Sequence, residues 1–173
     1  MASITRSLLI ARPAVLRLAP RAAPLAARTP FRTFSTSRMS LLRKYTKEHE
    51  WIDLSADQKT AVVGISEYAA EQLGDVVYVE LPETSGEWIE QGDALGAVES
   101  VKSASDINAP VRCKVTSVNV SLEEKPSTIN QVPEDDSVGG GWIAKVEVDE
   151  AGVKQVEALM DEASYKDFAH GEE

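Results

Sequence analysis

The sequence of 173 residues contains a single cysteine, Cys113, and only two histidines, His49 and His170. One cysteine excludes an internal disulfide and a cysteine-rich metal site. The two histidines lie far apart in the chain, so we expect neither a histidine-based metal site nor a nucleophile–base pair. Cys113 falls on the apolar phase of a strand pattern, which predicts a small buried side chain. We therefore predict a protein that is not an enzyme and binds no metal, although catalysis by carboxylates stays open.

Acidic residues are absent before Glu48, whereas the preceding residues contain ten of the 18 basic ones. From Glu48 onward, 28 acidic residues face eight basic ones, which gives this part a net charge of −20. Residues 1–41 are rich in Arg, Ala and Ser, a composition typical of a mitochondrial transit peptide. Long hydrophobic runs are also missing, because arginine interrupts every apolar stretch of this segment. No membrane span is expected.

These differences divide the chain into two parts. We predict that residues 1–41 are a disordered mitochondrial transit peptide that is removed, and that residues 42–173 form the mature domain in the mitochondrial matrix. A disordered basic arm that binds nucleic acid is the alternative for residues 1–41. Such arms favour lysine and lack Leu and Ile, so we expect no nucleic-acid partner.

Short segments of apolar and polar alternation, separated by Gly and Pro turns, fill the mature part. Ser66 is expected to cap a helix that ends at Gly74. A long loop is expected over residues 129–141, and Val76, Tyr78, Leu81 and Trp142 are expected in the core. Strands are predicted around 51–52, at 61–65, 75–82 and 142–148, and further helices at 121–124, 150–160 and 161–168. Short strands with peripheral helices predict a mainly β barrel or sandwich.

A lysine at the tip of a predicted hairpin is the most informative feature. Residues 96–101 form the first expected strand, and the second is expected to start at Val111. Lys102 lies in the Ser- and Asp-rich tip between them, where its ammonium is accessible. Its small neighbours would let an enzyme close over the amine, so the pattern indicates a modified lysine. An ordinary solubilising surface lysine is the alternative.

Four stretches resemble the H-protein family of the glycine cleavage system: Glu48–Trp51, Leu73–Pro82, Gly96–Asp106 and Gly141–Trp142. Together they span nearly all of residues 45–168. The resemblance implies a barrel-sandwich hybrid fold of the lipoyl- and biotinyl-carrier type. It also implies a lipoate covalently attached to Lys102 as N6-lipoyllysine. Two stretches depart from the family pattern, Arg112–Cys113 and the long loop before Trp142; both lie away from Lys102 and bear on partner contacts.

The resemblance further implies a non-catalytic carrier that serves several enzymes in glycine catabolism and one-carbon metabolism. A PLP-dependent glycine decarboxylase would load the aminomethyl group of glycine onto the lipoyl arm. A folate-dependent aminomethyltransferase would then take the one-carbon unit and free ammonia, and dihydrolipoyl dehydrogenase would reoxidise the dithiol. Lipoylating enzymes are expected as further partners. A tethered arm raises the effective concentration of its cargo at each docked enzyme.

Four carboxylates are candidates for roles around this arm. The loaded arm carries a protonated amine, and we expect Glu50 and Asp106, with Glu48, to hold it against the protein. The alternative is that Glu50 caps or solubilises a strand edge and that Asp106 fixes the turn. Glu99 is expected to be recognised by the lipoylating enzyme, against the alternative of ordinary surface charge.

Three other functions stay open at this point. A lipoyl or biotinyl domain of another complex would share the hairpin, but such domains carry Asp-Lys-Ala or Met-Lys-Met at the tip, and Val101–Ser103 matches neither. An enzyme of another kind would need a reactive cluster that the sequence does not suggest. An interaction module without lipoate, assisting lipoate transfer to other complexes, is the third.

Overall fold

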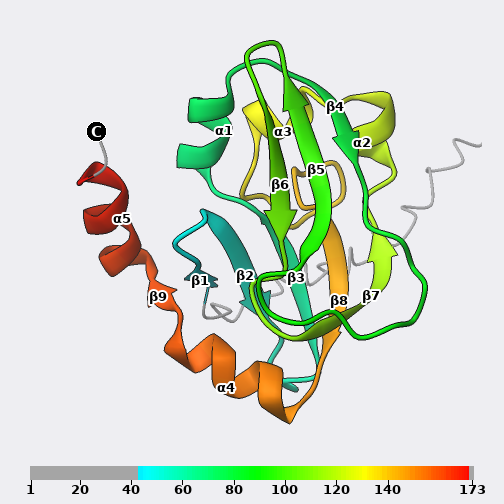
Figure 1. The fold of residues 1–173 in the computed structure, drawn as a ribbon, viewed down its shortest axis with the longest axis vertical. Coiled ribbons are helices and arrows are strands. Elements are labelled where there is room, and N and C mark those ends of the chain that lie inside the picture. Colours follow the sequence, from blue (N-terminus) through cyan, green and yellow to red (C-terminus); the bar gives the residue numbers. More distant parts are fainter. Residues whose placement is uncertain (1–42, 172–173) are drawn as a thin grey trace, which may run out of the picture. The chain divides into compact units, whose positions relative to one another are not determined.

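The computed structural model describes residues 43–171, which form two antiparallel sheets with short helices around them (Figure 1). The larger sheet has the strand order β7-β8-β3-β2-β1-β9, and the smaller one has the order β4-β5-β6. The strands are β1 (Arg43–Tyr45), β2 (Glu50–Leu54), β3 (Thr60–Ile65), β4 (Val76–Glu80), β5 (Ala94–Ser100), β6 (Ala104–Asn108), β7 (Cys113–Val118), β8 (Ala144–Val148) and β9 (Met160–Asp161). A mainly β fold is therefore confirmed.

The helices are α1 (Glu67–Leu73), α2 (Ser121–Glu124), α3 (Thr128–Gln131), α4 (Glu150–Ala158) and α5 (Glu162–His170). The predicted boundaries of α1 are confirmed. The Ser66 side chain accepts a hydrogen bond from the Ala69 amide, and Gly74 ends the helix with a positive φ of 71°. Asp149 and Asp161 cap α4 and α5 in the same way, by accepting from the Gly152 and Ser164 amides.

Apolar side chains of both sheets meet in one core, and a second aromatic cluster lies apart from it. Strand β2 contributes to both, because successive side chains point to opposite faces: Ile52 belongs to the main core and Trp51 to the second cluster. A Cβ atom at Gly64, opposite Trp51 in β3, would lie 2.7 Å from the indole ring. The second cluster also contains Tyr45, Tyr165 and Ala169, so it attaches helix α5 to β1 and β2.

The hairpin around Lys102 differs from the prediction. Its second strand is β6, which starts two residues after Lys102 and pairs with β5, whereas the strand expected from Val111 is β7 of the other sheet. The apolar alternation of β7 is real, with Cys113 and Val115 buried. The error arose because β6 begins with exposed Ala, Ser and Asp, which carry no apolar alternation to mark a strand.

Two further predictions were wrong. Residues 129–141 contain the end of helix α3, and Ile129 is fully buried. Tyr78 is 51 % exposed, because the β4–β5 register shifts between Val76 and Tyr78 and the bulge turns the following side chain outward. Of the other expected core residues, Val76 is buried, whereas Leu81 and Trp142 are half-buried. Strands β1 and β9 were not predicted.

The predicted transit peptide lies outside the described residues. Within residues 43–171, no helix has both the length and the apolar character needed to cross a bilayer.

Candidate functional site

Lys102 lies in the connection between β5 and β6, at the end of the smaller sheet, and its side chain is exposed (Figure 1). The hydroxyl of Ser100 organises this turn. It accepts hydrogen bonds from the amides of Lys102 (3.1 Å) and Ser103 (3.0 Å) and donates to the Ser103 carbonyl (3.0 Å). The Val101 amide donates to the Asp75 carbonyl, which fixes the tip to the start of β4. The lysine is thus presented on a defined turn.

The stem of Lys102 lies across the end of helix α1. A Cβ atom at Gly74 would come within 2.7 Å of Lys102 Cε and 3.1 Å of Nζ. A Cβ atom at this position would displace the flexible end of the lysine, whereas the positive φ that ends the helix requires glycine. Gly74 therefore ends the helix and leaves room for the lysine in the position seen here.

A cavity of about 200 Å³ begins beside the tip. Helix α1 forms one wall, β6 the second, and the turn between β1 and β2 closes the end. The apolar part of its lining comes from Ile65, Ala69, Leu73, Val98 and Ile107, and the polar part from Glu48, His49, Glu50, Gln72, Ser103, Ser105 and Asp106. The three carboxylates expected to act together do line one cavity, which starts next to Lys102.

Glu50 is 1 % exposed, although it carries a carboxylate. Its Oε1 accepts from the amide (2.9 Å) and the side-chain Nδ2 (3.1 Å) of Asn108, and its Oε2 accepts from the Thr46 hydroxyl. No ion pair joins Glu50 to a lysine, arginine or histidine among residues 43–171. A carboxylate offers about four acceptor sites, so three donors leave one site for a cation. Burial excludes the solubilising role considered for Glu50.

Asp106 and Glu48 are exposed and differ from Glu50 in this respect. Asp106 lies on β6 opposite Ala97 of β5, four residues after Lys102. The turn is fixed by Ser100, so Asp106 is not needed for that purpose. Glu48 lies in the β1–β2 turn and, like Glu50, also lines a second cavity of about 400 Å³, which reaches Leu159 and Met160. Thr46 and Asn108, which hold Glu50, carry no sequence signal of this role.

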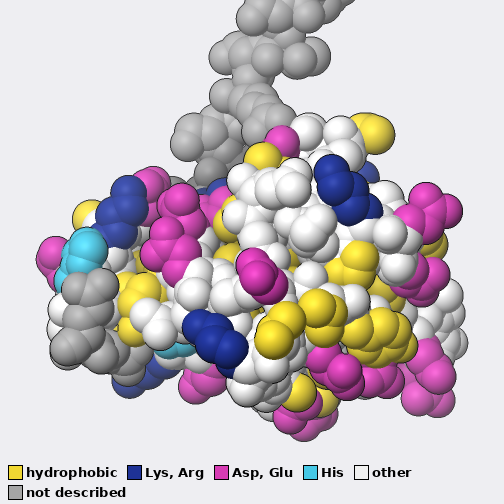
Figure 2. Space-filling model, turned by 90° about the horizontal axis from the view of Figure 1, so that it is seen from above, with side chains coloured by type: hydrophobic (Ala, Val, Ile, Leu, Met, Phe, Trp, Pro, Cys, Tyr) yellow, Lys and Arg dark blue, Asp and Glu magenta, His cyan; other side chains and the backbone are white. Residues whose placement is uncertain are grey.

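Glu99 lies on β5, exposed, and pairs across the sheet with Tyr78 of β4 and Ala104 of β6. Seen from the hairpin end, hydrophobic side chains gather in one area with acidic side chains at its edge (Figure 2). Exposed apolar side chains near the tip are Val77, Tyr78 and Val101. Cys113, by contrast, is buried as predicted, and burial raises the pKa of its thiol to about 11.

The described part of the chain contains no cluster of three or more His, Cys, Asp or Glu side chains suited to a metal ion. The chemistry available at the tip is that of one accessible primary amine beside an apolar cavity with acidic residues at its end. Such an arrangement can accept an acyl group on the lysine and can bind a short chain that ends in a cation.

Comparison with known proteins gives one family throughout. The family model described as glycine cleavage H-protein matches residues 43–172. A glycine cleavage system H protein of Thermotoga maritima is 45 % identical over 127 residues, covering 73 % of this chain and 95 % of that protein. The mitochondrial glycine cleavage system H protein of Saccharomyces cerevisiae is 48 % identical over 124 residues, covering 71 % of this chain and 69 % of its own.

A plant relative and a solved structure agree. The mitochondrial glycine cleavage system H protein 2 of Arabidopsis thaliana is 46 % identical over 130 residues, covering 75 % of this chain and 78 % of its own. The crystal structure of a glycine cleavage system H protein from Mycobacterium marinum matches with a TM-score of 0.60 and 35 % identity, covering 73 % of this chain and 95 % of that one. The expected barrel-sandwich hybrid is confirmed by this likeness.

Proposed function

The chain belongs to the glycine cleavage H-protein family, and from this premise we propose that it carries a lipoyl group on Lys102 in glycine cleavage. H proteins are non-catalytic carrier subunits of that system. Lys102 is supported as the attachment point because it is exposed on a turn that the hydrogen bonds of the Ser100 hydroxyl hold in place. Attachment forms an amide between Nζ and the carboxyl carbon of an activated lipoate, with loss of a proton from Nζ and departure of the activating group.

The residues around Lys102 fit a lipoyl arm. The cavity that begins at Ser103 has apolar walls from Leu73, Val98 and Ile107, which suit a hydrocarbon chain. The acidic end of the cavity suits a positive charge. When attached, the lipoyl group supplies a disulfide that can take up the aminomethyl fragment of glycine. This protein supplies the tether, the cavity and the carboxylates.

We assign Glu50 to binding the protonated amine of the loaded arm, with Asp106 and Glu48 as the other carboxylates that line the same cavity. Glu50 is buried, has one acceptor site left, and has no cationic partner among residues 43–171. An ammonium in a site of low dielectric gains more from such a carboxylate than it would in water. Holding the amine excludes water from it and slows loss of ammonia.

The partners follow from the family. The carrier would visit a PLP-dependent glycine decarboxylase, a folate-dependent aminomethyltransferase and dihydrolipoyl dehydrogenase in turn, after modification by lipoylating enzymes. We place it in the mitochondrial matrix, with residues 1–41 as the removed transit peptide and residues 42–173 as the carrier domain; two relatives are named mitochondrial. The acidic surface around the tip would steer docking onto basic rims of these enzymes (Figure 2).

Intact mass measurement of the mature protein, isolated from mitochondria, tests the attachment. We expect one lipoyl adduct, localised to Lys102 by fragmentation, and no glycine oxidation with a Lys102→Arg variant. A bare lysine together with an active Lys102→Arg variant would overturn the proposal and favour an interaction module without lipoate.

Ammonia release from the aminomethyl-loaded protein tests the carboxylate site. We expect Glu50→Gln to release ammonia roughly tenfold faster, since a charge-assisted hydrogen bond contributes about 1.5–3 kcal/mol. Glu124→Gln, on the exposed end of α2, is the matched control and should release at the wild-type rate. Equal rates in both variants would remove Glu50 from this role.

Glu99 is assigned to recognition by the lipoylating enzyme. It is exposed, lies three residues before Lys102, and is on the same hairpin. We expect Glu99→Gln to be lipoylated more slowly by the purified enzyme, with a raised KM. An unaltered KM and rate would leave Glu99 as ordinary surface charge.

A further inference from the structure

The cavity beside Lys102 is enclosed by two segments that are distant in the sequence. The β1–β2 turn contributes Glu48, His49 and Glu50, and helix α1 contributes Ala69, Gln72 and Leu73. The two segments meet through one backbone hydrogen bond of 2.8 Å, from the Ser66 amide to the His49 carbonyl. The packing of the turn against the helix therefore shapes the end of the cavity where Glu50 lies.

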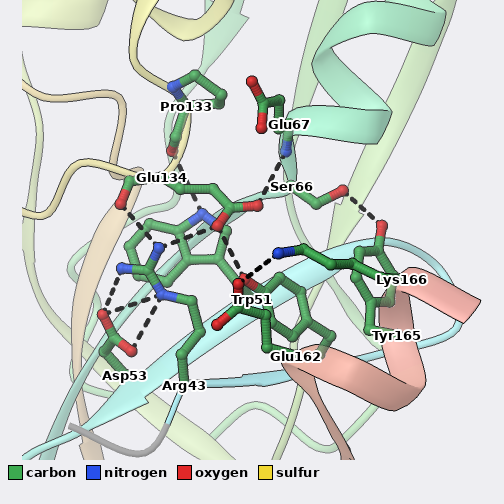
Figure 3. A network of polar contacts seen from close by, with 11 residues as sticks. Arg43, Trp51, Asp53, Ser66, Glu67, Pro133, Glu134, Glu162, Tyr165 and Lys166 are labelled. Carbon is green, nitrogen blue, oxygen red and sulfur yellow. Dashed lines mark hydrogen bonds and ion pairs between the residues drawn. The ribbon is translucent and has the colours of Figure 1, made fainter. Parts of the chain in front are cut away.

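One side chain from the C-terminal helix contacts both segments. The hydroxyl of Tyr165 shares a hydrogen bond of 2.6 Å with Ser66 Oγ and lies 2.8 Å from His49 Nδ1. Figure 3 shows the Ser66 side chain at the start of α1 pointing to the Tyr165 hydroxyl on α5. Ser66 is fully buried and also caps α1 through the Ala69 amide, so its oxygen is fixed at the helix end.

The turn needs such support because of His49. This residue has a φ of 74°, in the left-handed region that residues other than glycine rarely adopt. A backbone in that region persists only where its surroundings hold it. The His49 ring is enclosed by Tyr68, Tyr165 and Phe168, with ring centroids 4.8, 5.8 and 6.0 Å away. Two of these three rings belong to α5, so α5 contributes most of the enclosure.

Tyr165 is itself held firmly. It is 5 % exposed, and its ring stacks on Tyr45 of β1 at 4.4 Å with an interplanar angle of 5°. Its hydroxyl therefore has a fixed position relative to β1, from which the turn to Glu50 begins. Tyr165 is 99 positions from Ser66 and 116 from His49 along the chain.

We propose that Tyr165 is a positioning residue for the carrier site: its hydroxyl joins the Glu50 turn to helix α1 and so fixes the cavity that retains the loaded arm. This inference rests on the proposed function of that cavity. Tyr165 does not line the cavity, and its hydroxyl acts on the site through His49 and Ser66. The C-terminal helix is thereby part of the carrier site, although it lies outside the cavity lining.

Hydrogen–deuterium exchange and ammonia release, measured on the lipoylated full-length mature protein, test this together. Tyr165→Phe keeps the stacked ring and removes only the hydroxyl. We expect amide exchange of residues 46–50 and 66–73 to become roughly three- to tenfold faster, because about one hydrogen bond to each segment is lost. Exchange of residues 144–148 should be unchanged and serves as the internal reference. Ammonia release from the loaded protein should rise by a similar factor, with lipoylation of Lys102 unaltered.

The controls separate the possible failures. Lys166→Gln, on the exposed side of α5 beside Glu162, should change neither measurement. Unchanged amide exchange of both segments in Tyr165→Phe would overturn the proposal. It would also be overturned if Tyr165→Phe exchanged faster but released ammonia at the wild-type rate, while Glu50→Gln released ammonia faster. Faster exchange with no effect of Glu50→Gln on release would instead refute the assigned role of Glu50, and with it the functional part of this inference. Tyr165→Leu, which also removes the stack, should exceed Tyr165→Phe in both measurements.

Discussion

The side chain of Lys102 lies directly on the backbone of Gly74, at the end of helix α1. A Cβ atom there would be 2.7 Å from Lys102 Cε, closer than carbon atoms approach without displacement. The φ of 71° and ψ of −150° at Gly74 belong to a region that essentially only glycine adopts. The lysine stem and the helix end therefore meet at this glycine.

Substitution of this glycine should affect stability and modification together. We expect Gly74→Ala to unfold about 1–3 kcal/mol more easily in urea, because of backbone strain, and to be lipoylated more slowly, because the lysine stem is displaced. The matched control is Gly86→Ala, at a φ of 77° with nothing within 4 Å of an added Cβ. Gly86→Ala should lower the stability through backbone strain but leave the rate of lipoylation unchanged. Equal lipoylation rates in the two variants would contradict the link between Gly74 and Lys102.

Ser100 should matter for modification more than for stability. Its hydroxyl makes three hydrogen bonds within the exposed tip, and we expect Ser100→Ala to lower the lipoylation rate several-fold while changing the free energy of unfolding by less than about 1 kcal/mol. Ser117→Ala, at an exposed position of β7, is the control for a lost serine hydroxyl. Purified lipoylating enzyme and a urea titration supply the two measurements. A wild-type rate for Ser100→Ala would show that the turn forms without the hydroxyl.

The buried thiol predicts a dependence of stability on high pH. Burial raises the pKa of Cys113 from 9.0 to about 11, so the folded state keeps its proton after the unfolded state has lost it. The associated stability is complete below pH 9 and is lost as the pH rises toward 11, by roughly 1–3 kcal/mol. Urea titrations at several pH values should show a steeper decline in this window for the wild type than for Cys113→Ala. Identical slopes would contradict the assignment.

Glu134 should be a strong determinant of stability. Its carboxylate accepts hydrogen bonds from Arg43 Nη1 (3.0 Å), Tyr45 Oη (2.8 Å) and the Glu67 amide (3.0 Å), as Figure 3 shows in part. It therefore joins β1 to the start of α1. Glu134→Ala removes the carboxylate acceptor of Tyr45 Oη and of the Glu67 amide, whereas Arg43 keeps Asp53 and the backbone carbonyl of residue 134. We expect about 2–3 kcal/mol less stability by thermal or urea unfolding.

The comparison for Glu134 is the exposed ion pair between Lys166 and Glu162 on α5. Both side chains of that pair are more than 60 % exposed, so Lys166→Ala should cost no more than about 0.5 kcal/mol. Similar losses in the two variants would mean that the Glu134 contacts contribute no more than a surface pair.

Local signals in the sequence predicted local structure well. Ser66 and Gly74 mark the two ends of α1 because capping depends on neighbouring backbone groups. Lys102 could be selected as a candidate because the tip motif is continuous in sequence. Tyr78 was misplaced because a bulge shifts the register of β4, and alternation alone does not indicate where a bulge occurs.

The parts that could not be predicted depend on distant contacts. The buried Glu50 accepts hydrogen bonds from Asn108, which is 58 residues away in the chain. Nothing in the sequence around a glutamate indicates such a distant partner. Strand β6 could not be recognised from its polar residues, because its pairing with β5 depends on the turn at Lys102. Tyr165 lies within the predicted helix over residues 161–168, but its role could not be predicted because its contacts with His49 and Ser66 exist only in the folded chain.

The first described residue, Arg43, sets a limit on how far the amino terminus can be trimmed. Its guanidinium binds Asp53 and Glu134 and lies 4.2 Å above the Trp51 ring. A protease that stopped before residue 43 would leave this arrangement complete. Removal of Arg43 as well would leave two partly or fully buried carboxylates without their shared counter-ion, so the folded domain needs the chain from residue 43 onward.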